Sequence, residues 1–354
     1  MSSRRCPRCG AMYQAPARFC QNDGSPLIDV QASADTPQPP AVSRTEVRKA
    51  PATPSKGVDR ASTLTGQVLD GRYQVVKKLG EGGMSYVYLA RESDTNDTVA
   101  IKVLSPKLST EKSSVERLRR EAGLAMRLDH PNVCRILRLG ETEDGLIYLV
   151  MPYLQGDLMS DHEIRNGPFT LEQGMPLLLQ MCRGLHHAHA LHIIHRDLKP
   201  ENVMLVEDPG QGMRAVVMDF GLAKERRAEP EVAKLTATGI VLGTPEFMSP
   251  EQIRGKPLDG RSDIYALGIL AFEMFSGQLP FLGRSAQEMM IARLRGNAMP
   301  LRQVKPELPA KLESVIAKSL ETEPEKRWDS MSAFAEALSG VSGGGTMFAK
   351  LFKR

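Results

Sequence analysis

Residues 195–221 read H-R-D-L-K-P-E-N-V-M-L-V-E-D-P-G-Q-G-M-R-A-V-V-M-D-F-G. Two short apolar runs, residues 203–206 and 213–218, flank a Glu-Asp-Pro-Gly turn, and this pattern predicts a β-hairpin. Oxygen-bearing side chains stand at the open end of this hairpin, namely Asp197, Asn202 and Asp219. Oxygen ligands of this kind suit a hard divalent cation and a phosphate. We therefore expect the hairpin to carry the functional centre of the chain.

The residues of this stretch and their spacing resemble the catalytic loop and the metal loop of protein kinases. From here the chain resembles a bacterial, eukaryote-like Ser/Thr protein kinase over residues 73–339. The resemblance implies an α+β fold of two lobes, with a β-rich small lobe and a helical large lobe. It also implies a non-specific Ser/Thr protein kinase that transfers the γ-phosphoryl group of ATP to proteins, with Mg²⁺ or Mn²⁺ as cofactor.

The resemblance also implies roles for single residues of the quoted stretch. Asp197 orients the substrate hydroxyl and accepts its proton, and Lys199 steadies the transferring phosphoryl group. Asn202 and Asp219 hold the metal ion across the phosphates. His195 packs beneath the metal loop. A lysine two residues after the base is the Ser/Thr form of this loop.

A glycine-rich turn joins two alternating apolar strands within residues 73–89. Glycines let backbone amides approach a phosphate closely, and the turn resembles the kinase G-x-G-x-x-G-x-V loop with a serine at its third glycine position. At the expected hinge a proline replaces the usual glutamate and keeps the carbonyl that the adenine needs. The ATP-binding residues that the resemblance implies are Leu79, Gly80, Gly82, Ser85, Val87, Ala100, Lys102, Met151, Pro152, Leu154 and Met204.

A helix with one carboxylate on its apolar face is expected after the strand that ends in Lys102. Ser113 and Glu116 predict a capping box, and the helix is expected to run to about Leu128. Glu121 falls on the apolar arc of this helix. Burial of an unpaired carboxylate is unfavourable by several kcal/mol, so a cation is required, and Lys102 is the candidate. The resemblance implies the same pair, which aims the lysine at the nucleotide phosphates.

Residues 219–251 have the length of a switchable loop and contain three threonines. Arg196 is expected to face this loop, where phosphothreonine would supply an anion. We therefore expect autophosphorylation at Thr236 and Thr238, and the alternative is that both are ordinary loop threonines. The resemblance gives structural roles to four more residues: Thr244 contacts the catalytic loop, Glu251 pairs with Arg327, and Asp263 holds the backbone of the catalytic loop.

Residues 1–28 hold three of the five cysteines, in the spacing of a small zinc ribbon. The expected zinc ligands are Cys6, Cys9, Cys20 and Asp23. The segment resembles the ribbons found ahead of some bacterial kinases, and we expect it to serve protein contact or self-association. The alternative is a metal-free segment.

Composition gives the remaining boundaries. The chain of 354 residues is 41% hydrophobic with a net charge of +4, which allows a sizeable core and does not favour nucleic-acid binding. Residues 29–65 read as a flexible linker, residues 66–340 as the kinase domain with lobes 66–150 and 155–340, and residues 341–354 as a Gly-rich basic tail. The longest apolar run, residues 264–275, is too short for a membrane span and predicts a buried helix. Without a signal-peptide stretch we expect a cytoplasmic protein with reduced cysteines.

The sequence argues against three alternative interpretations. A pseudokinase scaffold would lack a catalytic part, yet all are present in order. A nucleic-acid reader centred on the ribbon would need a dense basic and aromatic surface, which residues 1–28 lack. A metal site formed by the five histidines within residues 186–195 has no standard ligand spacing. The basic tail reads as frayed, with a membrane or partner contact as the alternative.

Overall fold

The computed structural model describes residues 3–5, 12–14, 28–29, 60–82, 85–104, 112–208, 210, 212–220 and 245–342. The chain divides into two compact units, Met1–Lys56 and Gly57–Arg354. In the first unit, β1 (Ser3–Arg5) pairs antiparallel with both β2 (Met12–Gln14) and β3 (Ile28–Asp29). The four expected zinc ligands lie outside the described residues.

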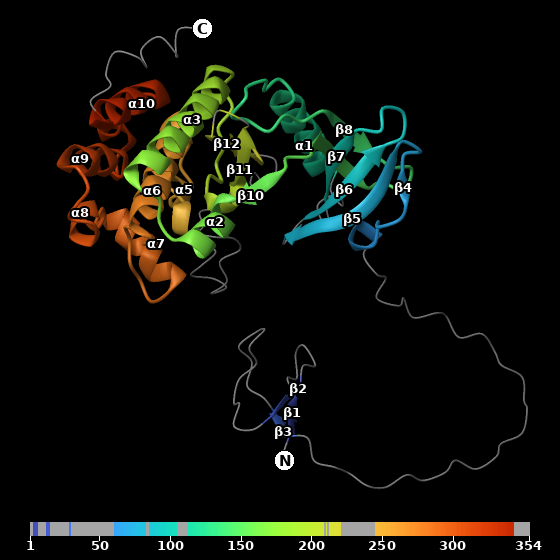
Figure 1. Cartoon of the computed structure of the whole chain (residues 1–354), viewed down its shortest axis with the longest axis horizontal. Coiled ribbons are helices and arrows are strands. Elements are labelled where there is room, and N and C mark those ends of the chain that lie inside the picture. Colours follow the sequence, from blue (N-terminus) through green and yellow to red (C-terminus); the bar gives the residue numbers. More distant parts are fainter. Residues whose placement is uncertain are drawn as a thin grey trace, which may run out of the picture. The chain divides into compact units, whose positions relative to one another are not determined.

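The β-rich lobe of the second unit is one antiparallel sheet of six strands (Figure 1). Its core consists of alternate side chains from neighbouring strands, including Tyr88, Ile101 and Tyr148, each fully buried. The strand order is β4-β5-β6-β7-β9-β8, with β4 (Val68–Leu69), β5 (Tyr73–Gly82), β6 (Ser85–Glu92), β7 (Thr98–Leu104), β8 (Arg138–Glu141) and β9 (Ile147–Pro152). The two strands expected on either side of the glycine-rich turn are therefore β5 and β6.

Residues 60–65 belong to this lobe, although composition assigned them to the linker. A short 3-10 helix, η1 (Arg60–Ser62), precedes the sheet, and Ala61 and Leu64 are fully buried in its core. The Tyr88 hydroxyl donates a hydrogen bond to the Ala61 carbonyl oxygen at 2.7 Å. A single buried leucine among polar neighbours hardly changes the local composition, so composition places the start of the domain several residues too late.

Helix α1 (Lys112–Ala125) is the helix expected after β7. It ends three residues before the predicted Leu128, and residues 126–128 continue as turns with backbone bonds back to 122–125. Leu128 is buried all the same, so the apolar periodicity extended past the last helical turn. The side chain of Ser113 is outside the described part, and the capping box stays a prediction.

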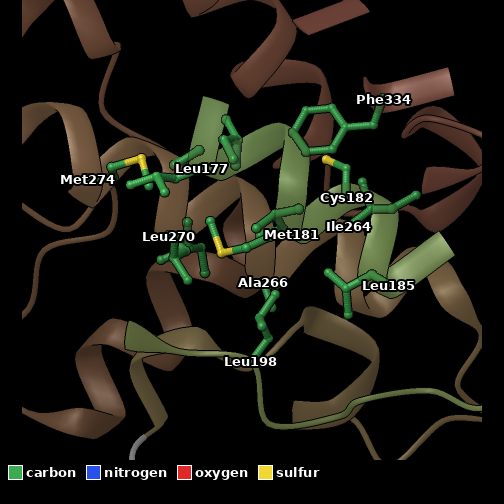
Figure 2. Packing of buried hydrophobic residues seen from close by; sticks show 14 of the residues in the cluster. Leu177, Met181, Cys182, Leu185, Leu198, Ile264, Ala266, Leu270, Met274 and Phe334 are labelled. Carbon is green, nitrogen blue, oxygen red and sulfur yellow. The ribbon is translucent and has the colours of Figure 1, made fainter. Parts of the chain in front are cut away.

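The helical lobe is built around α3 (Leu171–Ala190) and α6 (Gly260–Ser276). Figure 2 shows Leu177, Met181 and Leu185 of α3 among side chains of α6, with Phe334 of α10 beside them. Helix α6 is buried along nearly its whole length, which confirms the buried helix predicted from the apolar run at 264–275. The other helices are α2 (Met159–Asn166), α5 (Pro250–Ile253), α7 (Ala286–Arg295), α8 (Leu301–Val304), α9 (Ala310–Ser319) and α10 (Met331–Ser339). The predicted two-lobed α+β architecture is confirmed.

The hairpin predicted from the quoted stretch consists of β11 (Val203–Asp208) and β12 (Gly212–Val217). Strand β11 runs two residues further than predicted, because Glu207 and Asp208 pair with Met213 and Gly212 instead of turning, and β12 begins and ends one residue earlier than predicted. A third strand, β10 (Gly156–Leu158), pairs with β11 and was not predicted. A Cβ at Gly156 would collide with the Leu205 carbonyl oxygen, so only glycine lets these two backbones approach so closely.

Residues 132–134, which follow α1, attach to the helical lobe. Val133 forms a parallel bridge with Val217, and the Cys134 amide donates to the Val217 carbonyl oxygen at 2.8 Å. The Asn132 side-chain amide donates to the Ala215 carbonyl oxygen at 2.8 Å. A Cβ at Gly184 of α3 would lie 2.7 Å from the Asn132 carbonyl oxygen, so glycine permits this close packing. Among the described residues, no helix is long and apolar enough to cross a membrane.

Candidate active site

Asp263, in the first turn of α6, fixes the backbone of the catalytic loop. One carboxylate oxygen accepts the His195 amide at 2.8 Å, and the other accepts the Arg196 amide at 3.0 Å. His189 Nε2 lies 2.7 Å from the same carboxylate. Burial alone would raise the pKa of Asp263, but the hydrogen bond with His189 holds that pKa below its usual value. The ionised carboxylate keeps Arg196 at φ +66°, a left-handed conformation that is strained for a residue with a side chain.

His195 connects the catalytic loop to the segment that follows β12. Its ring is fully buried and packs edge to face on Phe220, with 4.7 Å between ring centroids. The Asp197 amide donates to Nδ1 at 3.2 Å, so the proton is on Nε2, which donates to the Met218 carbonyl oxygen at 2.7 Å. The backbones that carry Asp197 and Asp219 are thereby held through one imidazole.

The three residues with oxygen-bearing side chains named from the sequence are held at the open end of the hairpin by hydrogen bonds to the backbone. The Asn202 amide donates to the Asp197 backbone oxygen at 2.7 Å, and the Met218 amide donates to the Asn202 backbone oxygen at 2.8 Å. Asp219, at φ +61°, follows directly after this connection. Among the described residues, no group of three or more His, Cys, Asp or Glu side chains is placed to hold a metal ion. A carboxylate and an amide oxygen fit Mg²⁺, which takes its remaining ligands from water and phosphates.

Lys102 is ion-paired with Asp219, with 2.7 Å between Nζ and the carboxylate oxygen. Burial would raise the pKa of Asp219, but the positive charge of Lys102 holds it below its usual value. Glu121 is only partly buried, and its carboxylate oxygen lies 3.9 Å from an Arg196 guanidinium nitrogen. The structure thus brings Lys102 to Asp219 and Glu121 to Arg196, and the expected pair of Lys102 with Glu121 stays a prediction.

The residues expected around the nucleotide lie on β5, β6, β7 and β9, on β11 of the helical lobe, and, for Leu154, on the connection between β9 and β10. Gly80 pairs with Val87, and Ala100 pairs with Met151 on neighbouring strands. A Cβ at Gly80 would meet nothing within 4 Å, so the chain's own packing does not require glycine there, and the open space suits a phosphate. Leu79 is 40% exposed, and the other apolar members are partly exposed, which suits a surface that binds adenine. These partly exposed members are Val87, Ala100, Met151, Leu154 and Met204.

The segment after the switchable loop is tied to the catalytic loop. Arg327 donates to both carboxylate oxygens of Glu251, at 2.8 and 2.7 Å, and both side chains are buried. The Gln252 side chain donates to the Arg196 carbonyl oxygen at 2.8 Å, a contact that the sequence did not indicate. Lys199 is partly buried beside η3 (Pro200–Asn202). The three loop threonines Thr236, Thr238 and Thr244 lie outside the described residues.

Sequence reasoning missed a group of carboxylates beside the catalytic loop. Glu163, Glu201 and Glu273 line a cavity of about 350 Å³. Burial and the neighbouring negative charges raise the pKa of Glu163 to about 8 and that of Glu273 to about 7. The only signal in the sequence was the interruption of the apolar run by Glu273. Its partners come from separate segments, which no local pattern connects.

Comparisons with known proteins agree with this geometry. The family model described as "Protein kinase domain" matches residues 73–338. The chain is 39% identical over 277 residues to the Ser/Thr protein kinase pkn2 of Myxococcus xanthus, with 77% of this chain and 33% of that protein covered. It is 36% identical to the Ser/Thr protein kinase PrkC of Bacillus subtilis, with 75% and 40% covered. The structure resembles the kinase domain of Mycobacterium tuberculosis PknI with a TM-score of 0.61 at 28% identity, covering 78% of this chain and 98% of that domain. The chain spans between a third and a half of the length of these curated relatives.

Proposed function

This chain belongs to the protein kinase family, and we propose that it transfers the γ-phosphoryl group of ATP to Ser and Thr hydroxyls of proteins. The observation that carries the proposal is the meeting of Asp197, Asn202 and Asp219 at one end of a rigid hairpin, with Lys102 ion-paired to Asp219. The two matched relatives are named as Ser/Thr protein kinases, which supports the same substrate class.

In the proposed reaction Asp197 accepts the proton of the substrate hydroxyl and holds its oxygen toward the γ-phosphorus. Asn202 supports this role because its amide donates to the Asp197 backbone. Lys199 would place a positive charge near the oxygens that become more negative during transfer. Asn202 and Asp219 would hold Mg²⁺ or Mn²⁺, which would neutralise negative charge on the phosphates. Lys102 would contact the other phosphates.

We also propose that phosphorylation at Thr236 and Thr238 regulates the site through Arg196. The guanidinium of Arg196 lies 3.9 Å from Glu121 in the structure described here. A phosphothreonine carries a charge of about −2 at pH 7 and would compete with Glu121 for this guanidinium. Glu121 would then be released to pair with Lys102, which aligns the lysine with the phosphates. Phosphorylation of the loop would thereby control, through Arg196, whether Lys102 is aligned with the phosphates.

The test is the transfer of radiolabelled phosphate from ATP to a generic protein substrate. Asp197→Ala should reduce the rate by at least about a thousandfold. Asp94→Ala, at an exposed turn between β6 and β7, removes the same charge and should leave the rate unchanged. Equal transfer by wild type and Asp197→Ala would show that Asp197 is not the base. No transfer by wild type, with ATP binding intact, would favour the pseudokinase scaffold.

Mass spectrometry of the chain before and after incubation with ATP tests the regulatory part. Phosphate should appear on Thr236 and Thr238, and replacing both by alanine should lower the transfer rate. If the double alanine variant remains fully active, the switch assigned to Arg196 is wrong while the transfer reaction itself is unaffected.

The N-terminal segment is proposed to bind zinc through Cys6, Cys9, Cys20 and Asp23 and to serve protein contact or self-association. The support is the ligand spacing, since thiolates and a carboxylate are ligands that zinc accepts. The metal content of the full chain should be close to one zinc, and Cys6→Ser should abolish it. Zinc well below one equivalent in the wild type would remove the proposal. The cytoplasmic location expected from the sequence stays a prediction.

A further inference from the structure

A cavity in the described part of the helical lobe has no residue in common with the candidate active site. Its volume is about 650 Å³, within the range of sites that hold ligands or peptide side chains. It lies between the end of α7, residues 298–301, helix α9 and residues 320–323. Leu294, Ala298 and Met299 form part of an apolar floor, and all three are partly exposed.

The rim of this cavity is acidic. Among its lining residues are three acidic ones, Glu313, Glu321 and Glu323, against one cation, Arg295. Glu323 is neutralised in part by Lys326 at 3.1 Å. The Glu313 carboxylate accepts the backbone amide of residue 302 at 2.6 Å and still faces the rim as an anion. An occupant with large apolar side chains and positive charge would match both the floor and the rim.

Residues 343–354, G-G-G-T-M-F-A-K-L-F-K-R, have this chemistry. The segment combines Phe348, Leu351 and Phe352 with three basic side chains, and it contains no acidic residue. Its three glycines separate this amphipathic part from the end of α10. Neither the catalytic motifs nor the ribbon accounts for a cluster of this kind.

The point from which the segment leaves the described structure lies next to the cavity. Lys311, in the first turn of α9, donates to the Gly340 carbonyl oxygen at 2.6 Å. The next residues of the same helix, Glu313 and Ser314, line the cavity. One helical turn rises about 5.4 Å, whereas the five residues from 343 to 347 span up to roughly 17 Å when extended. Phe348 can therefore reach the cavity without any change in the fold.

We propose that residues 346–354 of the same chain dock into the cavity between α7 and α9. The apolar side chains cover Leu294 and Met299, and the basic side chains face Glu313 and Glu321. Because the linker is only a few glycines long, the effective concentration of the segment is on the order of millimolar. A docking constant of about 0.1 mM for the separate segment would then keep the cavity about 90% occupied within one molecule.

Hydrogen exchange of the full chain tests the proposal directly. The chain that ends after Ser342 should exchange the exposed amides of residues 294–301 and 320–323 about tenfold faster than the full chain. Phe348→Ser combined with Phe352→Ser in the full chain should give the same increase, and circular dichroism checks that the fold is kept. Equal exchange in the full and shortened chains would overturn the proposal. Protection that grows with protein concentration would also overturn it, because the occupant would then be the segment of a second copy.

The charge part of the proposal is tested with a fluorescent synthetic peptide of residues 343–354 on the shortened chain. Glu321→Lys should weaken its binding about three- to tenfold, as expected for the loss and reversal of an exposed ion pair. Glu307→Lys is the matched control, since it makes the same charge change at an exposed position outside the cavity. A peptide with Lys350→Glu should bind the Glu321→Lys variant better than it binds the shortened chain that retains Glu321. Equal weakening by both protein variants would show a general charge effect and would contradict docking at this rim.

Discussion

Replacing Arg327 by methionine is expected to lower the free energy of unfolding by about 3–5 kcal/mol, the range for removing one partner of a buried ion pair. The Arg327 guanidinium is fully buried and donates five hydrogen bonds. Two go to Glu251, and three go to the backbone oxygens of residues 321, 261 and 322. Methionine fills similar space but leaves the Glu251 carboxylate without its cation, while the hydrogen bond from the Ser262 hydroxyl at 2.6 Å remains. The buried carboxylate then accounts for most of the loss.

The pH dependence gives a second signature of the same pair. Burial would raise the pKa of Glu251, but the hydrogen bonds from Arg327 hold it below the usual 4.5. A lowered folded-state pKa means that the stabilisation is complete above pH 4.5 and is lost as pH falls through the folded-state pKa. In Arg327→Met the carboxyl can bind a proton in the folded state, so the deficit should be largest near pH 7 and should shrink toward pH 4.

The assay is denaturant unfolding, supported by thermal melts, at pH 7 and pH 4. For a domain of this size the expected loss corresponds to a fall in melting temperature of roughly 6–20 °C. Arg302→Met is the matched control, because Arg302 is exposed and should change stability by less than about 0.5 kcal/mol. A loss below about 1 kcal/mol at pH 7, or a loss that does not depend on pH, would refute the assignment of a buried charge pair.

Three further outcomes are expected. Glu163→Gln should stabilise the chain by roughly 2–4 kcal/mol at pH 8 and hardly at pH 4. The pKa of Glu163 is about 8 in the folded state, so the wild type loses stability as pH rises from 4.5 toward that value. Denaturant unfolding at both pH values measures the difference, and a difference that does not change with pH would contradict the prediction. Gly156→Ala should destabilise by about 1–3 kcal/mol, because its Cβ meets the Leu205 carbonyl oxygen; an unchanged melting temperature would show that β10 can move away. Asp263→Asn should lower phosphoryl transfer more than it weakens ATP binding, because it weakens the hold on the strained backbone at Arg196; parallel losses in both measurements would point to general unfolding instead.

Local patterns predicted the elements that carry the candidate site. The apolar runs on either side of the Glu-Asp-Pro-Gly turn predicted the hairpin, because alternation and turn residues act within a few positions of each other. The length of the apolar run at 264–275 likewise predicted the buried helix α6. Exact strand ends were not predictable, because the pairing of Asp208 with Gly212 depends on where the chain reverses.

Contacts between distant segments could not be read from the sequence. Glu121 was assigned a cation from its place on a helix, and the structure places it beside Arg196, which is remote in sequence. The pairing of Lys102 with Asp219 also joins different lobes. Helical periodicity identifies a carboxylate that needs a partner, but several cations can meet that need, and tertiary packing selects among them. The same reason explains why the carboxylates around Glu163 and Glu273 escaped notice.

The attachment of residues 132–134 to β12 restricts how the two lobes move. The chain crosses between the lobes after β9, near residues 152–156, and residues 132–134 provide a second fixed point through Val217 and Ala215. Two fixed points leave a rigid body only rotation about the line that joins them. We therefore expect the sheet-rich lobe to open and close by rotation about the line through these two attachment points.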